Sequence, residues 1–427
     1  MIEYHLPGIF VREQTLPAPL DWNDPEGEQI EVFVRELVDP DRRTQDLPLL
    51  TFLQGGPGGA NPRPTGRSGW IDEALKDYRI VLVDQRGTGR STPLEATMIA
   101  ERGERGGEFL VCFRADSIVR DLELVRREVY GSRRWATLGQ SYGGWLTMAY
   151  LSYAPEAITA SYVCGGIPGI PADVDEVYRR TFTRTEQKNA EYRRRFPHDV
   201  DTVAAIADVL AGSDVHLADG DRLTVERFQS LGSDFGMKPG FERMHWLIDE
   251  AFIRPGRLSE AFLAGVQART SSAGGPLYWS LQESIYADGT RGATAWSAQR
   301  ERDRRPQFGV AERPLLFTGE MSFPWMFEQV RLLRPAASAV HALHERGEWP
   351  ALYDLDRLAA NEVPLAAAVY FDDMYVDSGL QLDTLSKVGN AQNWVTNEFE
   401  HDGIATPEVF RRLRAMVRDH GGELPDR

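Results

Sequence analysis

The chain has 427 residues, of which 42% are hydrophobic and 10% aromatic, so it can bury a large core in two or three domain-sized units. Acidic residues outnumber basic ones by 64 to 48, and the net charge is −16. This balance disfavours nucleic acid or an anionic membrane as the main partner, because both favour a basic surface.

The cysteines and the N-terminus indicate the compartment. Cys112 and Cys164 are too few for a disulfide framework, and both lie in apolar surroundings, which predicts buried thiols. Cys and His show no metal-ligand spacing. The N-terminus lacks the pattern of a signal peptide, and no stretch approaches the roughly 18 apolar residues of a membrane span. We therefore expect a soluble, cytoplasmic, globular protein.

The first part of the chain alternates between predicted strands and predicted helices. Short apolar runs bounded by turn residues predict strands, and apolar residues at helical spacing predict helices. This alternation is typical of βαβ units and a parallel sheet. The predicted strands are 8–16, 29–38, 47–53, 78–84, 135–138 and 160–164, and the predicted helices are 70–77, 113–130 and 145–153.

The pattern changes at about residue 172. From there to about residue 350, charged and helix-prone stretches dominate, which predicts a mostly helical insertion. Strand-like runs return at 363–371 and 393–396, and a last helix is expected at 407–420. We therefore expect an α/β core formed by residues 1–171 and 351–427, with residues 172–350 as a lid.

The strongest chemical signal is the Gly-Gln-Ser-Tyr-Gly sequence around Ser141. It follows a predicted strand and precedes a predicted helix, which is the setting of a nucleophile elbow. In such an elbow the turn is so tight that the neighbouring residues must be small, and the serine hydroxyl stands above the sheet. Ser141 is therefore the candidate nucleophile.

A serine nucleophile needs a histidine base and a carboxylate that orients the base. In folds built around such a nucleophile elbow, the acid and the histidine both follow the serine in the chain. His401 lies on a loop between a predicted strand and the last helix, whereas His341 and His344 lie in a helical stretch. The acid should end the preceding strand. Asp373 is our choice there, because Asp-x-x-Val after a strand is the usual setting for this carboxylate. Asp372 is the alternative, and Asp377 lies too far along the chain.

The glycine-rich residues 55–59 follow an early predicted strand. Acyl transfer needs backbone N–H groups directed at the developing oxyanion, and glycine exposes such groups. We expect one donor from Tyr142, which follows the nucleophile, and one from Gly56. No Lys-Ser/Thr pair follows at P-loop spacing, so a phosphate-binding loop is not supported.

Together these motifs resemble the prolyl aminopeptidases (proline iminopeptidases), which are α/β-hydrolase-fold serine peptidases. The resemblance covers about 1–170 and 360–427, and it rests on residues 55–59, 84–91 and 139–144, the strand end at Asp372 and Asp373, and the His401-Asp-Gly sequence. One departure is Gln54, where such enzymes usually have His.

The resemblance implies that the lid closes over the triad and that acidic lid residues bind the free α-amino group of the substrate. Glu283 and Glu320 are the candidates. Aromatic residues beside them could enclose a proline ring; these are Tyr278, Trp279, Phe323 and Trp325.

The expected activity is therefore release of N-terminal proline, or another small N-terminal residue, from small peptides through an acyl-enzyme, without a metal or cofactor. An esterase or amidase of the same fold with a different acyl pocket is the alternative, because the triad does not distinguish amides from esters. A ligand-binding protein without activity is disfavoured by the intact set of triad residues.

Overall fold

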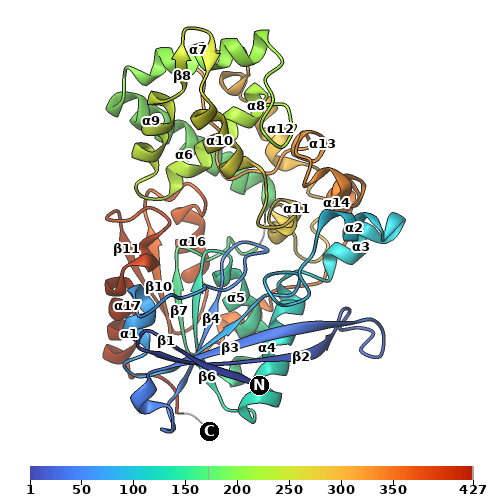
Figure 1. Cartoon of the computed structure of the whole chain (residues 1–427). Coiled ribbons are helices and arrows are strands. Elements are labelled where there is room, and N and C mark those ends of the chain that lie inside the picture. Colours follow the sequence, from blue (N-terminus) through green and yellow to red (C-terminus); the bar gives the residue numbers. More distant parts are fainter. Residues whose placement is uncertain (172, 426–427) are drawn as a thin grey trace.

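A nine-stranded sheet forms the base of the molecule in the computed structural model, which describes residues 1–171 and 173–425 (Figure 1). The strand order is β1-β2-β3-β5-β4-β6-β7-β10-β11. The pairs β1–β2, β2–β3 and β3–β5 are antiparallel, and every later pair is parallel. The bounds are β1 Ile2–Leu6, β2 Ile9–Pro19, β3 Gln29–Val38, β4 Leu49–Leu53, β5 Arg79–Val83, β6 Trp135–Gln140, β7 Ile158–Cys164, β10 Leu365–Tyr370 and β11 Ala391–Thr396.

Helices cover both faces of the parallel part of this sheet. Every residue of β4, β5, β7 and β10 is buried, as expected for parallel strands between two helical layers. Helices α1 and α17 pack on one face, and α4 and α5 pack on the other. The helices of this base are α1 Gly69–Ala74, α2 Ala96–Ala100, α3 Gly106–Val111, α4 Ala115–Tyr130, α5 Gly143–Tyr153, α15 Leu355–Ala359, α16 Ser378–Leu385 and α17 Pro407–Asp419.

The predicted helical insertion lies between β7 and β10 and covers one end of the sheet (Figure 1). Its only strands among the described residues form a short hairpin, β8 Phe252–Arg254 and β9 Arg257–Leu258. The predicted limits of 172 and 350 stay a prediction. The helices are α6 Val174–Arg195, α7 Asp199–Gly212, α8 Val225–Gln229, α9 Gly240–Asp249, α10 Glu260–Thr270, α11 Leu277–Leu281, α12 Ser297–Asp303, α13 Met326–Gln329 and α14 Ala337–Glu345.

Glycines let this lid approach the base closely. A Cβ at Gly58, in the glycine-rich loop after β4, would lie 2.6 Å from the Cβ of Leu277 in α11. At a second contact, a Cβ at Gly106 in α3 would lie 2.5 Å from the Cβ of Ala339 in α14. The lid therefore rests directly on the loop after β4 and on α3.

Two expectations from composition can be compared with the structure. None of the described helices is long and apolar enough to cross a membrane. Cys164 is buried in β7 as predicted, but Cys112 is only partly buried, so the prediction for Cys112 was wrong. Cys112 comes directly after α3, at the end of the helix, and is only partly covered there.

A buried ion pair joins the loop after β5 to α4. Arg86 donates to both carboxylate oxygens of Asp121, at 2.6 and 2.7 Å, and its remaining N–H groups reach the carbonyls of Pro19, Leu20 and Cys112. Both side chains are almost completely buried. Because every guanidinium N–H has an acceptor, the desolvated charge is fully compensated.

Replacing Asp121 by alanine is expected to lower the free energy of unfolding by about 3–5 kcal/mol, because it leaves the Arg86 charge buried without a counterion. Urea denaturation measures this loss. The control is Asp208→Ala, which breaks the exposed pair with Arg313 and should cost at most about 1 kcal/mol. Equal losses in the two variants would contradict the prediction.

Candidate active site

Ser141 stands at the sharp turn between β6 and α5. Its φ angle is +55°, in the left-handed region that a serine rarely adopts. The glycines after it are needed for close packing: a Cβ at Gly143 would overlap the carbonyl oxygen of Leu53, and one at Gly144 would overlap that of Gly166. This strained, crowded turn is the geometry of a nucleophile elbow.

Asp373 and His401 form a buried pair at the carboxyl end of the same sheet. His401 Nδ1 lies 2.7 Å from Asp373 Oδ2, and the two residues are 2% and 1% exposed. The other oxygen of Asp373 accepts hydrogen bonds from the backbone N–H groups of Tyr375 and Val376, at 2.8 and 3.1 Å. These donors fix the orientation of the carboxylate, so that its second oxygen faces the histidine ring.

Asp372, the alternative acid, points elsewhere. Its carboxylate is partly exposed and pairs with Arg184 of α6 at 3.1 Å. Of the two neighbouring aspartates, therefore, only Asp373 contacts His401. The two side chains diverge because they leave the end of β10 in different directions.

His401 Nε2 is buried and has no hydrogen-bond partner among the described residues, so it is not bonded to the Ser141 hydroxyl. Ser141 and Asp373 nevertheless belong to one cluster: the Ser141 N–H donates to Cys164 O at 3.0 Å, and a Cβ on the next residue, Gly165, would lie 3.4 Å from Asp373 Oδ2. Serine–histidine hydrogen bonds are often long without substrate. The Nε2 atom is therefore able to accept a proton, as a general base must.

The environment of His401 favours its charged form. Burial lowers its pKa, but the charge and hydrogen bond of Asp373 and the charge of Glu320 together raise it above the ordinary value. A histidine that gains a proton readily is suited to accept one from a serine hydroxyl.

The glycine-rich loop packs against the nucleophile through Gly55. A Cβ at Gly55 would lie 3.0 Å from Ser141 Cβ, whereas one at Gly56 would lie 2.9 Å from the backbone nitrogens of Gly58 and Gly59. The predicted donor Gly56 is thus one residue beyond the closest approach. Tyr142 is the N-cap residue of α5, so its amide lies at a helix N-terminus, where negative charge is stabilised.

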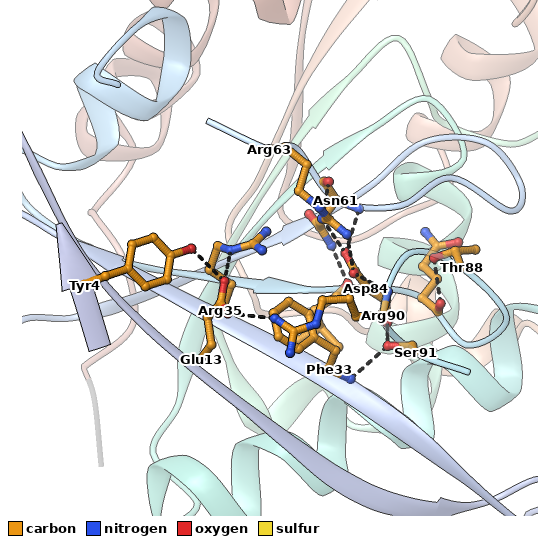
Figure 2. A network of polar contacts seen from close by, with 12 residues as sticks. Tyr4, Glu13, Phe33, Arg35, Asn61, Arg63, Asp84, Thr88, Arg90 and Ser91 are labelled. Carbon is orange, nitrogen blue, oxygen red and sulfur yellow. Dashed lines mark hydrogen bonds and ion pairs between the residues drawn. The ribbon is translucent and has the colours of Figure 1, made fainter. Parts of the chain in front are cut away.

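A polar network holds this loop in place (Figure 2). The Asp84 carboxylate accepts from the Asn61 N–H at 3.1 Å, from Arg63 at 2.5 and 2.8 Å, and from the Arg90 N–H at 2.9 Å. Arg90 also bonds Glu13 of β2, which ties the loop to the antiparallel strands. Residues 84–91 therefore position the loop, which explains a motif to which the sequence alone assigned no role.

Gln54, the departure from the family pattern, keeps a supported position. The Gln85 side chain donates to the Gln54 carbonyl at 2.8 Å. The backbone at the start of the loop is therefore held whichever side chain stands at position 54.

Glu320 lines a cavity of about 580 Å³ beside the Asp373–His401 pair, together with Gly58, Tyr278 and Trp279. The Tyr278 hydroxyl donates to Glu320. Burial raises the pKa of Glu320 to about 7, although hydrogen bonds from Tyr278 and Gln282 and the charge of His401 lower it. A cationic ligand in this cavity would strongly favour the ionised carboxylate.

Glu283 lies outside this cavity. It is 0% exposed, and its oxygens accept from the backbone N–H groups of Ser297 and Ala298, at 3.0 and 2.9 Å. His344 Nδ1 lies 3.1 Å away. The expectation that both glutamates project into one cavity does not fit this geometry, because Glu283 is occupied at the N-terminus of α12.

The four aromatic residues expected to enclose a proline ring also fall into two pairs, one inside and one outside the cavity. Tyr278 and Trp279 line the cavity, but Phe323 and Trp325 do not. Phe323 is fully buried and its ring stacks against that of Trp325. Phe323 and Trp325 therefore pack in the core of the lid, which no local sequence pattern reveals.

One group in the lid has the composition of a metal site. His198, Asp199 and His245 bring ligand atoms within 4.8 Å of one another, at the start of α7 and on α9. His198 and Asp199 are adjacent, but His245 is distant in the sequence, so spacing did not reveal the group. The Tyr192 hydroxyl and His245 Nδ1 both bond Asp199, so an ordinary hydrogen-bond network accounts for it.

Comparison with known proteins identifies the family of the chain. Residues 48–210 match the family model described as the alpha/beta hydrolase fold. The chain is 42% identical to a proline iminopeptidase of Aeromonas sobria, over 98% of this chain and 99% of that protein. It is 32% identical to a proline iminopeptidase of Aspergillus aculeatus, over 95% of this chain and 93% of that protein. The chain therefore belongs to the proline iminopeptidase family of α/β hydrolases.

Proposed function

We propose that the protein is a serine aminopeptidase that releases N-terminal proline from peptides. The observation that carries this proposal is the position of Glu320, which lines a cavity beside the buried Asp373–His401 pair. A carboxylate there can bind the free ammonium of a substrate and so select peptides by their N-terminus. An esterase of the same fold needs no such carboxylate.

The reaction proceeds through an acyl-enzyme. Ser141 Oγ attacks the carbonyl carbon of the first residue while His401 Nε2 takes the hydroxyl proton, and Asp373 stabilises the resulting imidazolium. Backbone N–H groups of Tyr142 and of the loop around Gly56 hold the oxyanion. His401 then gives its proton to the leaving amine, and a water molecule activated by His401 releases proline. No step requires a metal or cofactor.

The lid supplies the specificity. The Tyr278 hydroxyl holds Glu320, and Tyr278 and Trp279 form an apolar wall that suits a pyrrolidine ring. Glu283 keeps its place at α12 and supports the lid in this proposal. Small peptides with a free N-terminus are the expected substrates, and a cytoplasmic location stays a prediction from the sequence.

Proline 4-nitroanilide should be cleaved efficiently, and N-acetylproline 4-nitroanilide should be cleaved at least about a hundredfold less well, because acetylation removes the ammonium that Glu320 binds. Release of nitroaniline measures both rates. 4-Nitrophenyl acetate is the control for esterase activity. Efficient cleavage of the acetylated substrate would contradict the aminopeptidase proposal and favour the esterase or amidase alternative.

Glu320→Gln should lower kcat/KM for proline 4-nitroanilide by about 30-fold or more, because it leaves a partly desolvated ammonium without its counterion, at roughly 2–5 kcal/mol. Hydrolysis of the uncharged ester 4-nitrophenyl acetate should change much less. Equal losses on the two substrates would indicate a structural role for Glu320.

The same variant should move the pH profile. The negative charge of Glu320 raises the pKa of His401, so its removal lowers that pKa. The acid limb of kcat/KM for the uncharged ester should therefore shift to lower pH in Glu320→Gln. A shift to higher pH, or none, would show that Glu320 does not act on His401.

A further inference from the structure

The cavity beside the catalytic pair contains positive as well as negative groups. Besides Glu320, its lining includes Arg243 of α9 and Arg269 of α10. It borders the catalytic centre at Tyr375, which lines the cavity and whose ring meets the His401 ring edge-on at 4.9 Å between centroids. A ligand in this cavity would therefore lie next to the catalytic pair and to these arginines.

The two arginines differ in what already binds them. Arg269 donates to Asp234 at 3.0 Å and to the carbonyl of Gly265 at 2.8 Å. The Arg243 side chain makes no hydrogen bond or ion pair within residues 1–171 and 173–425. Arg243 thus presents an uncommitted guanidinium to the cavity, a group suited to bidentate binding of a carboxylate.

Opposite charges line this cavity, since both Glu320 and Arg243 border it. The pKa of Tyr375 is raised by burial and by the charges of Glu320, Asp234 and Asp373, and it is lowered by the charge of Arg243. Glu320 and Arg243 therefore both act on one tyrosine ring. Asp234 is neutralised by Arg269, which leaves one carboxylate and one guanidinium for a ligand.

A short peptide carries the complementary charges, an ammonium at one end and a carboxylate at the other. Each added residue lengthens a peptide by at most about 3.6 Å, so only in a short peptide do both charges fall within one cavity. The volume of about 580 Å³ lies in the range of sites for small ligands.

We propose that Arg243 binds the free C-terminal carboxylate of the substrate, so that di- and tripeptides beginning with proline are preferred over longer or C-terminally blocked peptides. This inference rests on the proposed aminopeptidase function and deepens it by naming the substrate class. Glu320 selects the amino end of the peptide, and Arg243 selects the carboxyl end.

The test compares prolylglycine with prolylglycine amide, which differ only in the C-terminal charge. Native protein should cleave the free acid better, and Arg243→Gln should lower kcat/KM for it by about tenfold, mainly through KM. The loss on the amide should be at least fivefold smaller, and Arg243→Lys should keep part of the preference. Equal losses on both substrates, or none on either, would overturn the proposal.

Arg254→Gln is the matched control. Arg254 is exposed on β8 in the same lid, and its replacement makes the same change in net charge without touching the cavity. This variant should leave the ratio of the two substrates unchanged. A loss of preference equal to that of Arg243→Gln would mean that overall lid charge, rather than Arg243, selects the substrate.

Binding measurements separate this inference from the proposed function. Calorimetry with the Ser141→Ala variant needs no turnover, and adding Arg243→Gln to it should weaken prolylglycine binding about tenfold. If native protein fails to cleave proline 4-nitroanilide, the proposed function fails while this measurement still decides the role of Arg243. Unchanged affinity in the double variant, or no dipeptide binding to the Ser141→Ala protein, would overturn the inference.

Discussion

Replacing Ser141 by alanine is expected to lower kcat for proline 4-nitroanilide by about 10³- to 10⁶-fold, because the variant lacks the hydroxyl on which the acyl-enzyme forms. His401→Ala should have a loss of similar size, since the serine hydroxyl is a poor nucleophile without a base. Steady-state kinetics with purified variants measures both losses.

The double variant gives the sharper result. If Ser141 and His401 act as a unit, Ser141→Ala/His401→Ala should be little worse than either single variant. A fluorophosphonate probe should label the native protein and leave Ser141→Ala unlabelled. Nearly full activity in Ser141→Ala would end the acyl-enzyme hypothesis, whereas multiplied losses in the double variant would show that the residues act separately.

Asp373→Asn should lower kcat by about 10⁴-fold, because an amide no longer stabilises the His401 imidazolium and favours the wrong ring tautomer. The 2.7 Å contact between His401 Nδ1 and Asp373 Oδ2 is the structural basis of this effect. The turn at Tyr375 and Val376 should persist, since the amide oxygen can still accept from these N–H groups.

Asp372→Asn is the matched control, one residue away with the same chemical change. Asp372 pairs with Arg184 near the surface, so its replacement should change kcat by less than about threefold. Circular dichroism of both variants separates misfolding from lost catalysis. A larger loss in Asp372→Asn than in Asp373→Asn would reverse the assignment of the acid.

Much of the fold could be predicted from local patterns. The run at 78–84 predicted a buried parallel strand, and β5 spans Arg79–Val83. The helix expected at 113–130 is α4, Ala115–Tyr130. These elements were readable because burial on both faces demands continuous apolar residues and a helix demands apolar residues every three to four positions. The β8–β9 hairpin was missed, since such short strands leave almost no periodic signal.

The candidate site also has a part that the sequence predicts and a part that it does not. The elbow at Ser141 and the loop at His401 were predictable because a tight strand–helix turn requires glycines at fixed offsets and because the chain order of the partners follows from the fold. A family resemblance suggested the lid glutamates. The elbow and the order of the triad residues depend on neighbouring residues and on topology, and a sequence carries this information directly.

The tertiary structure shows which side chain among similar ones faces the site. Asp373 rather than Asp372 contacts His401, and Glu320 rather than Glu283 lines the cavity. Arg243 stands out from Arg269 because both line the cavity but only Arg269 is paired with Asp234. Each outcome depends on the direction in which a side chain leaves the backbone and on partners far away in the chain. Local composition specifies neither, so the sequence by itself determined the α/β scaffold and the candidate catalytic residues, and long-range packing determined the residues of the proposed binding site.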